Sequence, residues 1–296
     1  MVIGASGNSA NFASWKGLET PPEMDERQFS QWTALLRAKT GMRLSKERKS
    51  FLITSLNLRM REIGYHNYQS YYEYLQSGKA GKLEWTALVD RLTVHETRFF
   101  RDQNAMAFLE SECVEILSQD NSELQIWSAG CSTGEEPYSI AMLVESLLEK
   151  QHKKKYYGIS ATDISLMSLA KAKRGVFNRK RLEQVPDEMV FEYFEEQKNL
   201  QYKVKDRIKS RICFAQMNIL DCATARLGKA DVIYCQNLLI YFDQDKRTEI
   251  LNGMVIHLKP GGVLILGPGE VIEWNNPLVN REKHNKVLAY RRLKNS

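Results

Sequence analysis

Two adjacent carboxylates, Glu135 and Glu136, follow a glycine-containing loop, and this combination restricts the ligands that the loop could bind. The loop is not the dinucleotide motif G-x-G-x-x-G, which brings a pyrophosphate onto a helix N-terminus. Two carboxylates at that place would repel a phosphate, but they suit a cationic amine or sugar hydroxyls. S-adenosylmethionine carries both, together with a sulfonium. The alternative is an ordinary strand-to-helix turn, whose acids lie in the first helical turn because the helix dipole favours them there.

The elements that position these carboxylates are predicted from the segment 123–138, ELQIWSAGCSTGEEPY. Its first part is apolar and strand-forming, and its middle part is a run of small residues that leaves the backbone exposed to a bulky ligand. Pro137 suits the first helical position, since its missing N–H would have no partner there. The segment is therefore predicted to be a strand, a bare loop and a helix. Such a unit can hold a nucleoside-bearing ligand at the carboxyl edge of a parallel sheet.

The stretch LTVHETRFFRD, residues 92–102, places polar and charged side chains around two adjacent aromatic residues. We interpret it as part of a site, because many groups able to form hydrogen bonds are concentrated there. The alternative is a helix terminus with Phe99 and Phe100 in the core and the charges outside.

Asp163 follows a predicted strand, 157–162, and lies 33 residues after Gly130. An acid at this place could accept hydrogen bonds from both ribose hydroxyls of an adenosine, since a carboxylate has two acceptor oxygens. Its alternative role is the N-cap of a helix that starts near Ser165, and the two roles are compatible.

Strand and helix patterns alternate from residue 123 onward, which predicts an α/β sheet with helices on both faces. The alternation breaks at about 176–209, where a helix-like piece, 187–196, precedes a polar hairpin, QKNLQYKV. We interpret this part as a small inserted β-subdomain. The predicted strands of the main sheet are 124–128, 157–162, 211–216, 231–235, 263–267 and 286–290.

The chain before this sheet has two parts. Residues 1–22 are rich in Ser, Gly, Asn and Ala and end in two prolines, which predicts a flexible tail. Residues 23–91 have helical periodicity and predict an all-α domain. A positive surface can dock an acidic protein or nucleic acid, although a solvated face is the commoner reason for a charge run. The second helix, predicted from Ser45 to Gly64, has such a surface, with Arg43, Lys46, Arg48, Lys49, Arg59 and Arg61 in or beside it.

The composition of the 296-residue chain, with 43% hydrophobic residues, is that of a globular protein. The sequence contains neither a membrane-length apolar run nor a recognisable secretion signal, so we expect a cytoplasmic protein without direct membrane insertion. Five scattered cysteines without a C-x-x-C pair predict reduced thiols, with neither zinc nor a disulfide. The net charge of +6 comes from 42 basic and 36 acidic residues that are interspersed, which is typical of a solvated surface.

Five segments, in order, resemble one family: LTVHETRFFRD, WSAGCSTGEEPYSIAM, ATDIS, CQNLLIYFD and LKPGGVLILGPGE. The chain is similar over about residues 25–292 to the chemotaxis receptor glutamate O-methyltransferases, the CheR family. The resemblance implies a Rossmann-like domain that binds S-adenosylmethionine, releases S-adenosylhomocysteine and uses no metal. It also implies a protein substrate, namely glutamate side chains on the helical cytoplasmic bundle of chemoreceptors. A nucleic-acid methyltransferase and an inactive signalling scaffold are the alternatives, and we expect no nucleic-acid partner.

The resemblance also assigns roles to individual residues. It puts Arg101 and Tyr241 beside the transferable methyl group, where both act in catalysis. This chain departs from the family at His95, where asparagine is common, and at Gly267-Pro268-Gly269-Glu270, where many members have Gly-His-Ser-Glu. The implied cofactor-binding residues are His95, Thr97, Arg101, Gly130, Glu136 (the methionine end), Asp163 (the ribose), Asn218, Ile219, Asn237 and Leu238.

The implied reaction requires little chemistry from the protein. A glutamate side chain, with a pKa near 4.3, is already ionised at neutral pH and needs no general base. What remains is to align and desolvate its oxygen, and Arg101 and Tyr241 can both donate hydrogen bonds to a carboxylate. Alternatively, Arg101 pairs with Asp102 or Glu96.

The inserted subdomain bears on how the substrate is recognised. Family members that bind the C-terminal pentapeptide of a receptor have a longer, glycine-containing hairpin loop at this place, whose edge strand accepts the peptide. The corresponding stretch here, 195–202, is short and contains no glycine, although Asn199 could supply one left-handed position. The chain therefore resembles the members that act without this tether.

Overall fold

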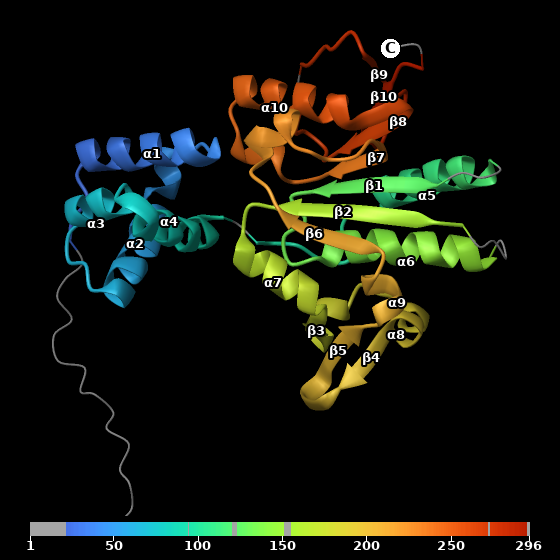
Figure 1. Cartoon of the computed structure of the whole chain (residues 1–296), viewed down its shortest axis with the longest axis horizontal. Coiled ribbons are helices and arrows are strands. Elements are labelled where there is room, and N and C mark those ends of the chain that lie inside the picture. Colours follow the sequence, from blue (N-terminus) through green and yellow to red (C-terminus); the bar gives the residue numbers. More distant parts are fainter. Residues whose placement is uncertain (1–21, 94, 120–122, 151–154, 272, 295–296) are drawn as a thin grey trace, which may run out of the picture.

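The computed structural model describes residues 22–93, 95–119, 123–150, 155–271 and 273–294. The tail predicted at residues 1–22 lies outside the described residues except for Pro22, whose carbonyl accepts a hydrogen bond from Tyr68 (3.1 Å). Figure 1 shows a helical bundle beside a twisted sheet, with a smaller lobe below the sheet. In the part of the chain that is described, no helix combines the length and the apolar character needed to cross a membrane.

The N-terminal domain is all-α, as predicted. Its core contains Trp32, Leu52, Tyr71 and Leu88, one from each helix. The second helix begins at Lys49 and not near Ser45, because residues 46–48 form a separate 3₁₀ turn. It ends where predicted, at Gly64, whose φ of 78° gives a left-handed C-cap. The four helices are α1 (Glu26–Thr40), α2 (Lys49–Ile63), α3 (Tyr68–Leu75) and α4 (Gly78–Leu92).

The second domain is built on a mostly parallel seven-stranded sheet of order β6-β2-β1-β7-β8-β10-β9, which confirms the predicted fold class. The first five strands of this order pair in parallel, and β10 is antiparallel to both neighbours. All six predicted strands are present, but β8 begins five residues before its predicted start and β9 was missed. The strands are β1 (Leu124–Ala129), β2 (Tyr157–Asp163), β6 (Ile212–Gln216), β7 (Ala230–Cys235), β8 (Leu258–Leu266), β9 (Val279–Arg281) and β10 (Leu288–Arg292).

The side chains of each central strand alternate between two hydrophobic cores, one on each face of the sheet. In β7, Val232 packs into the core that includes α5 (Gln103–Ser118) and α6 (Glu135–Lys150). Its neighbour Ile233 packs into the opposite core, which includes α10 (Gln244–His257). Helices therefore cover both faces of the sheet, as predicted from the alternation of the sequence.

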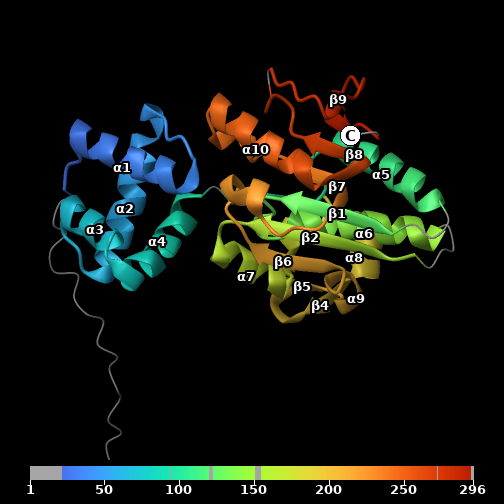
Figure 2. The same ribbon diagram turned by 45° about the horizontal axis from the view of Figure 1, so that its top comes forward.

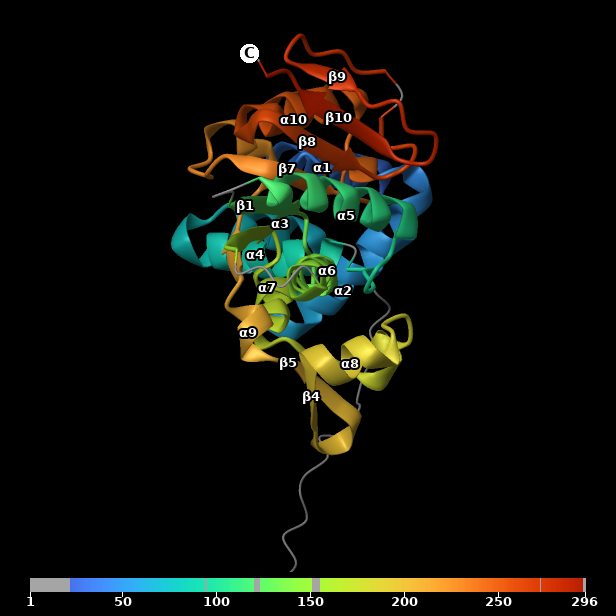
Figure 3. The ribbon, with the colours of Figure 1, turned by 90° about the vertical axis from the view of Figure 1, so that its right-hand side faces the viewer.

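The inserted β-subdomain is a three-stranded antiparallel sheet of order β3-β5-β4, which lies below the main sheet (Figure 3). The helix predicted at 187–196 ends at residue 193, because the next four residues pair with β5 instead. Asn199 takes the left-handed conformation as anticipated, and so does Leu200 (φ 61° and 54°). The subdomain consists of β3 (Val176–Asn178), a 3₁₀ turn η2 (Arg179–Leu182), α8 (Asp187–Tyr193), β4 (Phe194–Gln197), β5 (Gln201–Val204) and α9 (Asp206–Lys209).

The helical domain packs against the loops that follow β2, β6 and β7 (Figures 1 and 2). Asn218 donates a side-chain hydrogen bond to the carbonyl of Lys39 (3.0 Å). The Arg43 N–H donates to the carbonyl of Tyr241 (2.8 Å). A surface shared by the two domains therefore lies at the carboxyl edge of the parallel strands.

Candidate active site

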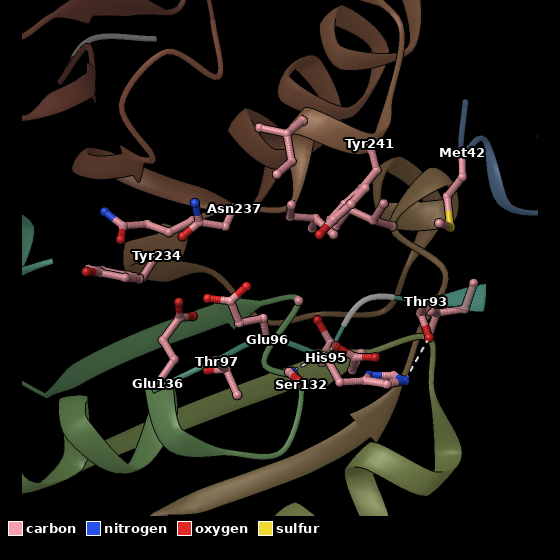
Figure 4. A pocket seen from close by; sticks show the side chains of 18 of the residues that line it. Met42, Thr93, His95, Glu96, Thr97, Ser132, Glu136, Tyr234, Asn237 and Tyr241 are labelled. Carbon is pink, nitrogen blue, oxygen red and sulfur yellow. Dashed lines mark hydrogen bonds between the residues drawn. The ribbon is translucent and has the colours of Figure 1, made fainter. Parts of the chain in front are cut away.

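A pocket with a volume of about 220 Å³ lies at this edge, and both domains contribute to its wall. In Figure 4, Tyr241 and Asn237 lie on one side of the pocket, and Glu96, Glu136 and Thr97 lie across from them. The structure thus brings together side chains that are up to 202 residues apart in the chain, as from Thr40 to Phe242. Every site residue predicted from the sequence lines this pocket: His95, Thr97, Arg101, Gly130, Glu136, Asp163, Asn218, Ile219, Asn237, Leu238 and Tyr241.

The loop after β1 has the backbone conformation that its small residues allow. Gly130, Ser132 and Gly134 have positive φ values of 78°, 49° and 100°. A Cβ atom at Gly130 would lie 3.1 Å from the side chain of Leu238 on the facing wall, so the glycine keeps this part of the pocket open. Helix α6 begins at Glu135, two residues earlier than predicted from Pro137, which occupies the third position of the first turn.

The two adjacent glutamates have different surroundings, and only Glu136 lines the pocket. Its carboxylate accepts a hydrogen bond from the Ser128 hydroxyl (2.6 Å). Burial raises the pKa of Glu136 to about 8, and the nearby carboxylate of Glu270 adds to this shift. Glu135 accepts from the Thr133 hydroxyl and lies 3.7 Å from Arg181. The suggestion that both acids face the ligand is therefore wrong, because successive residues on a helix point about 100° apart.

Asp163 holds the two loops that flank the end of β2. Its Oδ2 accepts from the N–H of Ser132 and its Oδ1 from the N–H of Ser165, both at 2.8 Å. Each oxygen keeps a second lone pair for a ligand. The N-cap of α7 (Leu166–Arg174) is Ser165, whose hydroxyl accepts from Ser168, and not Asp163. Burial raises the pKa of the Asp163 carboxyl above its ordinary value.

The segment 95–101 contributes five residues to the pocket wall, His95, Glu96, Thr97, Arg98 and Arg101, and Figure 4 shows the first three across from Tyr241. His95 uses both ring nitrogens within the protein, because Nε2 contacts the Asp90 carbonyl (2.7 Å) and Nδ1 contacts the Ser168 hydroxyl (2.9 Å). The Arg101 guanidinium donates to the backbone carbonyl of Glu96 (3.0 Å), so the suggested pairing with a carboxylate of Asp102 or Glu96 does not occur. Within the described part of the chain, this leaves most of the N–H groups of Arg101 for a ligand or substrate.

The loop after β7 carries Asn237 and Tyr241, and the carboxylate of Glu270 holds it. Glu270 is fully buried, and its oxygens accept from the N–H of Leu239 (2.9 Å) and the N–H of Gly267 (2.7 Å). A Cβ at Gly267 would lie 2.5 Å from that carboxylate, so a larger residue there would displace the Glu270 side chain. Asn237 has a φ of 58°, an uncommon conformation that this support stabilises. The Gly267–Glu270 turn thus shapes one wall of the pocket.

Several residues of the pocket were missed by the sequence analysis. Ser132 and Tyr234 each have a buried hydroxyl that, within the described residues, lacks a hydrogen-bond partner. A buried hydroxyl of this kind is uncommon and fits a site that accepts a polar ligand. The position of Tyr234 near the carboxyl end of a predicted strand was the signal that could have found it. Thr40 and Met42 come from the helical domain, and no local pattern marks them as pocket residues.

A mostly parallel sheet with a pocket at its carboxyl edge, and with an acid at the end of the second strand, is typical of Rossmann-like proteins that bind nucleosides. Comparison with known families narrows this class. Residues 27–93 match the family model described as CheR methyltransferase, all-alpha domain. Residues 95–287 match the one described as CheR methyltransferase, SAM binding domain. The chain belongs to the CheR methyltransferase family.

Similar proteins extend over most of the chain. A chemotaxis protein methyltransferase of Pseudomonas putida is 33% identical over 82% of this chain and 90% of its own length. One of Borreliella burgdorferi is 31% identical over 80% of this chain and 86% of its own length. One of Escherichia coli is 29% identical over 83% of this chain and 85% of its own length. The enzyme is therefore an S-adenosylmethionine-dependent methyltransferase, and the resemblance found in the sequence is confirmed.

Proposed function

We propose that the enzyme methylates glutamate side chains on the helical cytoplasmic part of chemoreceptors, giving glutamate methyl esters in sensory adaptation. The observation that carries this proposal is that one pocket, at the junction with the helical domain, is lined both by Arg101 and Tyr241 and by the residues that we propose bind the cofactor. The names of the similar chemotaxis protein methyltransferases support it.

The pocket residues fit S-adenosylmethionine, which supplies a methyl group bound to a sulfonium. Glu136 would pair with the ammonium group of its methionine end, and Asp163 would accept from the ribose hydroxyls. The hydroxyls of Ser132 and Tyr234, which lack a hydrogen-bond partner among the described residues, are further polar groups that the cofactor could satisfy. Around the adenosine, we propose contacts with Asn218, Ile219, Asn237 and Leu238.

The acceptor carboxylate would be oriented by Arg101 and Tyr241. Arg101 keeps N–H groups for an incoming carboxylate because it makes one hydrogen bond, to a backbone carbonyl, among the described contacts. Burial raises the pKa of Tyr241, so its phenol stays protonated and can donate a hydrogen bond at neutral pH. Neither residue has to remove a proton, since the substrate glutamate is already ionised. Their role is to align one oxygen with the methyl group and to replace its water.

The basic surface of the helical domain would dock the acidic substrate helices, but one of its predicted residues has another function. Arg59 is bound bidentately to buried Glu84 (2.7 and 2.6 Å) and also to Glu62 (2.9 Å). It stabilises the domain, and we no longer assign it to docking. Arg61 and Lys46 are exposed and keep the proposed role.

We further propose that docking needs no C-terminal pentapeptide tether. The turn between β4 and β5 is three residues long, Lys198–Leu200, and contains no glycine. Two of these residues are left-handed, which leaves the turn little freedom to open a peptide groove. Titration with receptor C-terminal pentapeptides should detect no binding, while a tail-deleted receptor is still methylated. Micromolar binding that maps to residues 195–205 would contradict this part of the proposal.

The central test follows the methyl group. With tritiated S-adenosylmethionine and a purified receptor cytoplasmic fragment, we expect label on glutamates that alkali releases as methanol, since carboxyl esters are base-labile. In Arg101→Ala, turnover should fall about a hundredfold or more while S-adenosylhomocysteine affinity changes much less. Tyr241→Phe should act in the same direction. Alkali-stable label, or label on RNA or DNA, would refute the proposal.

A further inference from the structure

The inserted subdomain contacts the pocket wall through one arginine. Arg181, in the 3₁₀ turn η2, donates a hydrogen bond to the backbone carbonyl of Thr97 (2.8 Å). The same guanidinium lies 3.7 Å from the carboxylate of Glu135, whose side chain is 1% exposed. Arg181 thus joins three parts of the molecule: the subdomain, the first turn of α6 and the segment 95–101.

A second contact is the ring of Phe99, which lies two residues after Thr97 and is fully buried. It packs edge-on against Phe177 of β3, with ring centroids 5.0 Å apart, and against Phe194 of β4 at 5.8 Å. Edge-to-face packing of this kind restricts the orientation of each ring. Strands β3 and β4 of the inserted subdomain therefore form the surface against which Phe99 packs.

The next residue, Phe100, has a φ of 49°, an uncommon conformation for a residue with a bulky side chain. Its N–H donates to the hydroxyl of Ser139 on α6 (3.0 Å), and that hydroxyl donates to the carbonyl of Glu135 (2.7 Å). Strained backbone persists where its surroundings over-determine it. Here the strained residue separates Phe99, held by the subdomain, from Arg101, which lines the pocket.

We infer that the inserted subdomain is the platform that positions the segment 95–101 for methyl transfer, and that Arg181 is a positioning residue. Arg181 is not among the residues that line the pocket, and it acts through the Thr97 carbonyl. This inference rests on the proposed function, because it takes Arg101 to orient the acceptor carboxylate. It gives the subdomain a role within a single molecule of enzyme.

The test compares two arginines of the same 3₁₀ turn. Arg181→Ala removes the bond to Thr97, whereas Arg179→Ala removes a pair with exposed Asp187 and serves as the matched control. We expect Arg181→Ala to lower kcat about tenfold and to weaken S-adenosylhomocysteine binding less than about threefold. Arg181→Lys should recover part of the loss, since an ammonium can donate to the same carbonyl. Arg179→Ala should match wild type.

The readouts are kcat at saturating cofactor, S-adenosylhomocysteine affinity by calorimetry, and Tm. An equal kcat in Arg181→Ala and Arg179→Ala would overturn the inference, and so would a lower Tm with unchanged kcat in Arg181→Ala. The variant Arg101→Ala distinguishes a failure of the proposed function from a failure of the proposed positioning role of Arg181. Full activity of Arg101→Ala would refute the proposed role of that residue in transfer. A slow Arg101→Ala beside a fast Arg181→Ala would refute only the platform.

Discussion

Glu84 in the helical domain and Glu136 in the pocket have very different partners. In the helical domain, Glu84 is 6% exposed and accepts two hydrogen bonds from Arg59 and one from the Tyr71 hydroxyl (2.7 Å). In the pocket, Glu136 receives one hydrogen bond, from Ser128, and its pKa is raised to about 8. The helical domain thus pairs its buried acid directly with an arginine, whereas the charge of Arg101 in the pocket only partly offsets the raised pKa of Glu136.

The difference separates a structural charge from a functional one. A buried charge is costly unless it is paired and hydrogen-bonded. Glu84 meets this condition within the chain and can support the fold alone. Burial raises the pKa of Glu136, which indicates that its surroundings do not fully offset the cost of ionising it. A cationic ligand would supply the missing charge, which is the condition that the cofactor's ammonium group satisfies.

The largest effect on stability should come from breaking the ion pair between Arg59 and Glu84. Arg59→Ala leaves the buried carboxylate of Glu84 without its counter-charge and should lower the free energy of unfolding by about 3 kcal/mol. The control is Arg61→Ala on the same helix, which is exposed and should change stability by less than about 0.5 kcal/mol. Urea unfolding of both variants measures the difference. Equal stabilities would mean that the Arg59–Glu84 pair contributes nothing to the fold.

A smaller loss is expected at Asp163, whose oxygens have lone pairs left for the ribose. Asp163→Ala should weaken S-adenosylmethionine binding by about 1.5–3 kcal/mol, the range for hydrogen bonds to a charged group. Circular dichroism should be nearly unchanged. Calorimetry gives the affinity, and a value equal to that of wild type would remove Asp163 from the proposed site.

The pH dependence of cofactor binding tests directly whether the carboxylate of Glu136 pairs with the cationic group of the cofactor. With a pKa of about 8, Glu136 is mostly protonated at neutral pH in the ligand-free enzyme. Because a cationic ligand favours the carboxylate, binding should release a proton, and affinity should rise by up to about tenfold per pH unit below pH 8. The free energy of unfolding without ligand should decrease as the pH rises from the ordinary pKa of a glutamate, 4.5, to about 8. In this interval the folded state keeps a proton on Glu136 that the unfolded chain has already lost.

Calorimetry in buffers with different ionisation enthalpies counts the released proton. Glu136→Gln, which cannot ionise, should flatten both the affinity profile and the stability profile. It should bind S-adenosylmethionine more weakly than wild type at pH 8. An affinity of the wild-type enzyme that does not change between about pH 6 and pH 8 would contradict the assignment of Glu136 to the ammonium group.

The smallest effect is expected on the exposed basic surface. Arg61→Glu should slow methylation of the receptor fragment severalfold without changing cofactor affinity, because a surface charge mainly affects encounter with an acidic partner. Raising the ionic strength should slow the wild-type enzyme in the same way, since exposed charges are screened. Methylation that is indifferent to salt would show that this helix face is only solvated.

The amino-acid sequence by itself was enough to predict the parallel sheet, the bare loop after β1 and the acid at the end of β2. These features depend on local patterns: alternating apolar residues, small residues at a turn and a polar residue at a strand end. The short strand β9 was missed because its three residues carry too weak a pattern. The start of β8 was placed too late because Pro260, Gly261 and Gly262 interrupt its apolar run.

Only the tertiary structure decided which charged residues are functional. Arg59 and Arg61 lie two positions apart in one basic run. Only Arg59 binds Glu84, which lies 25 residues later in the chain, whereas Arg61 is exposed. Glu135 and Glu136 are adjacent, yet only Glu136 lines the pocket. In both cases the choice depends on how a helix is rotated against its neighbours. That rotation is set by packing between segments distant in the chain, so no local pattern could reveal it.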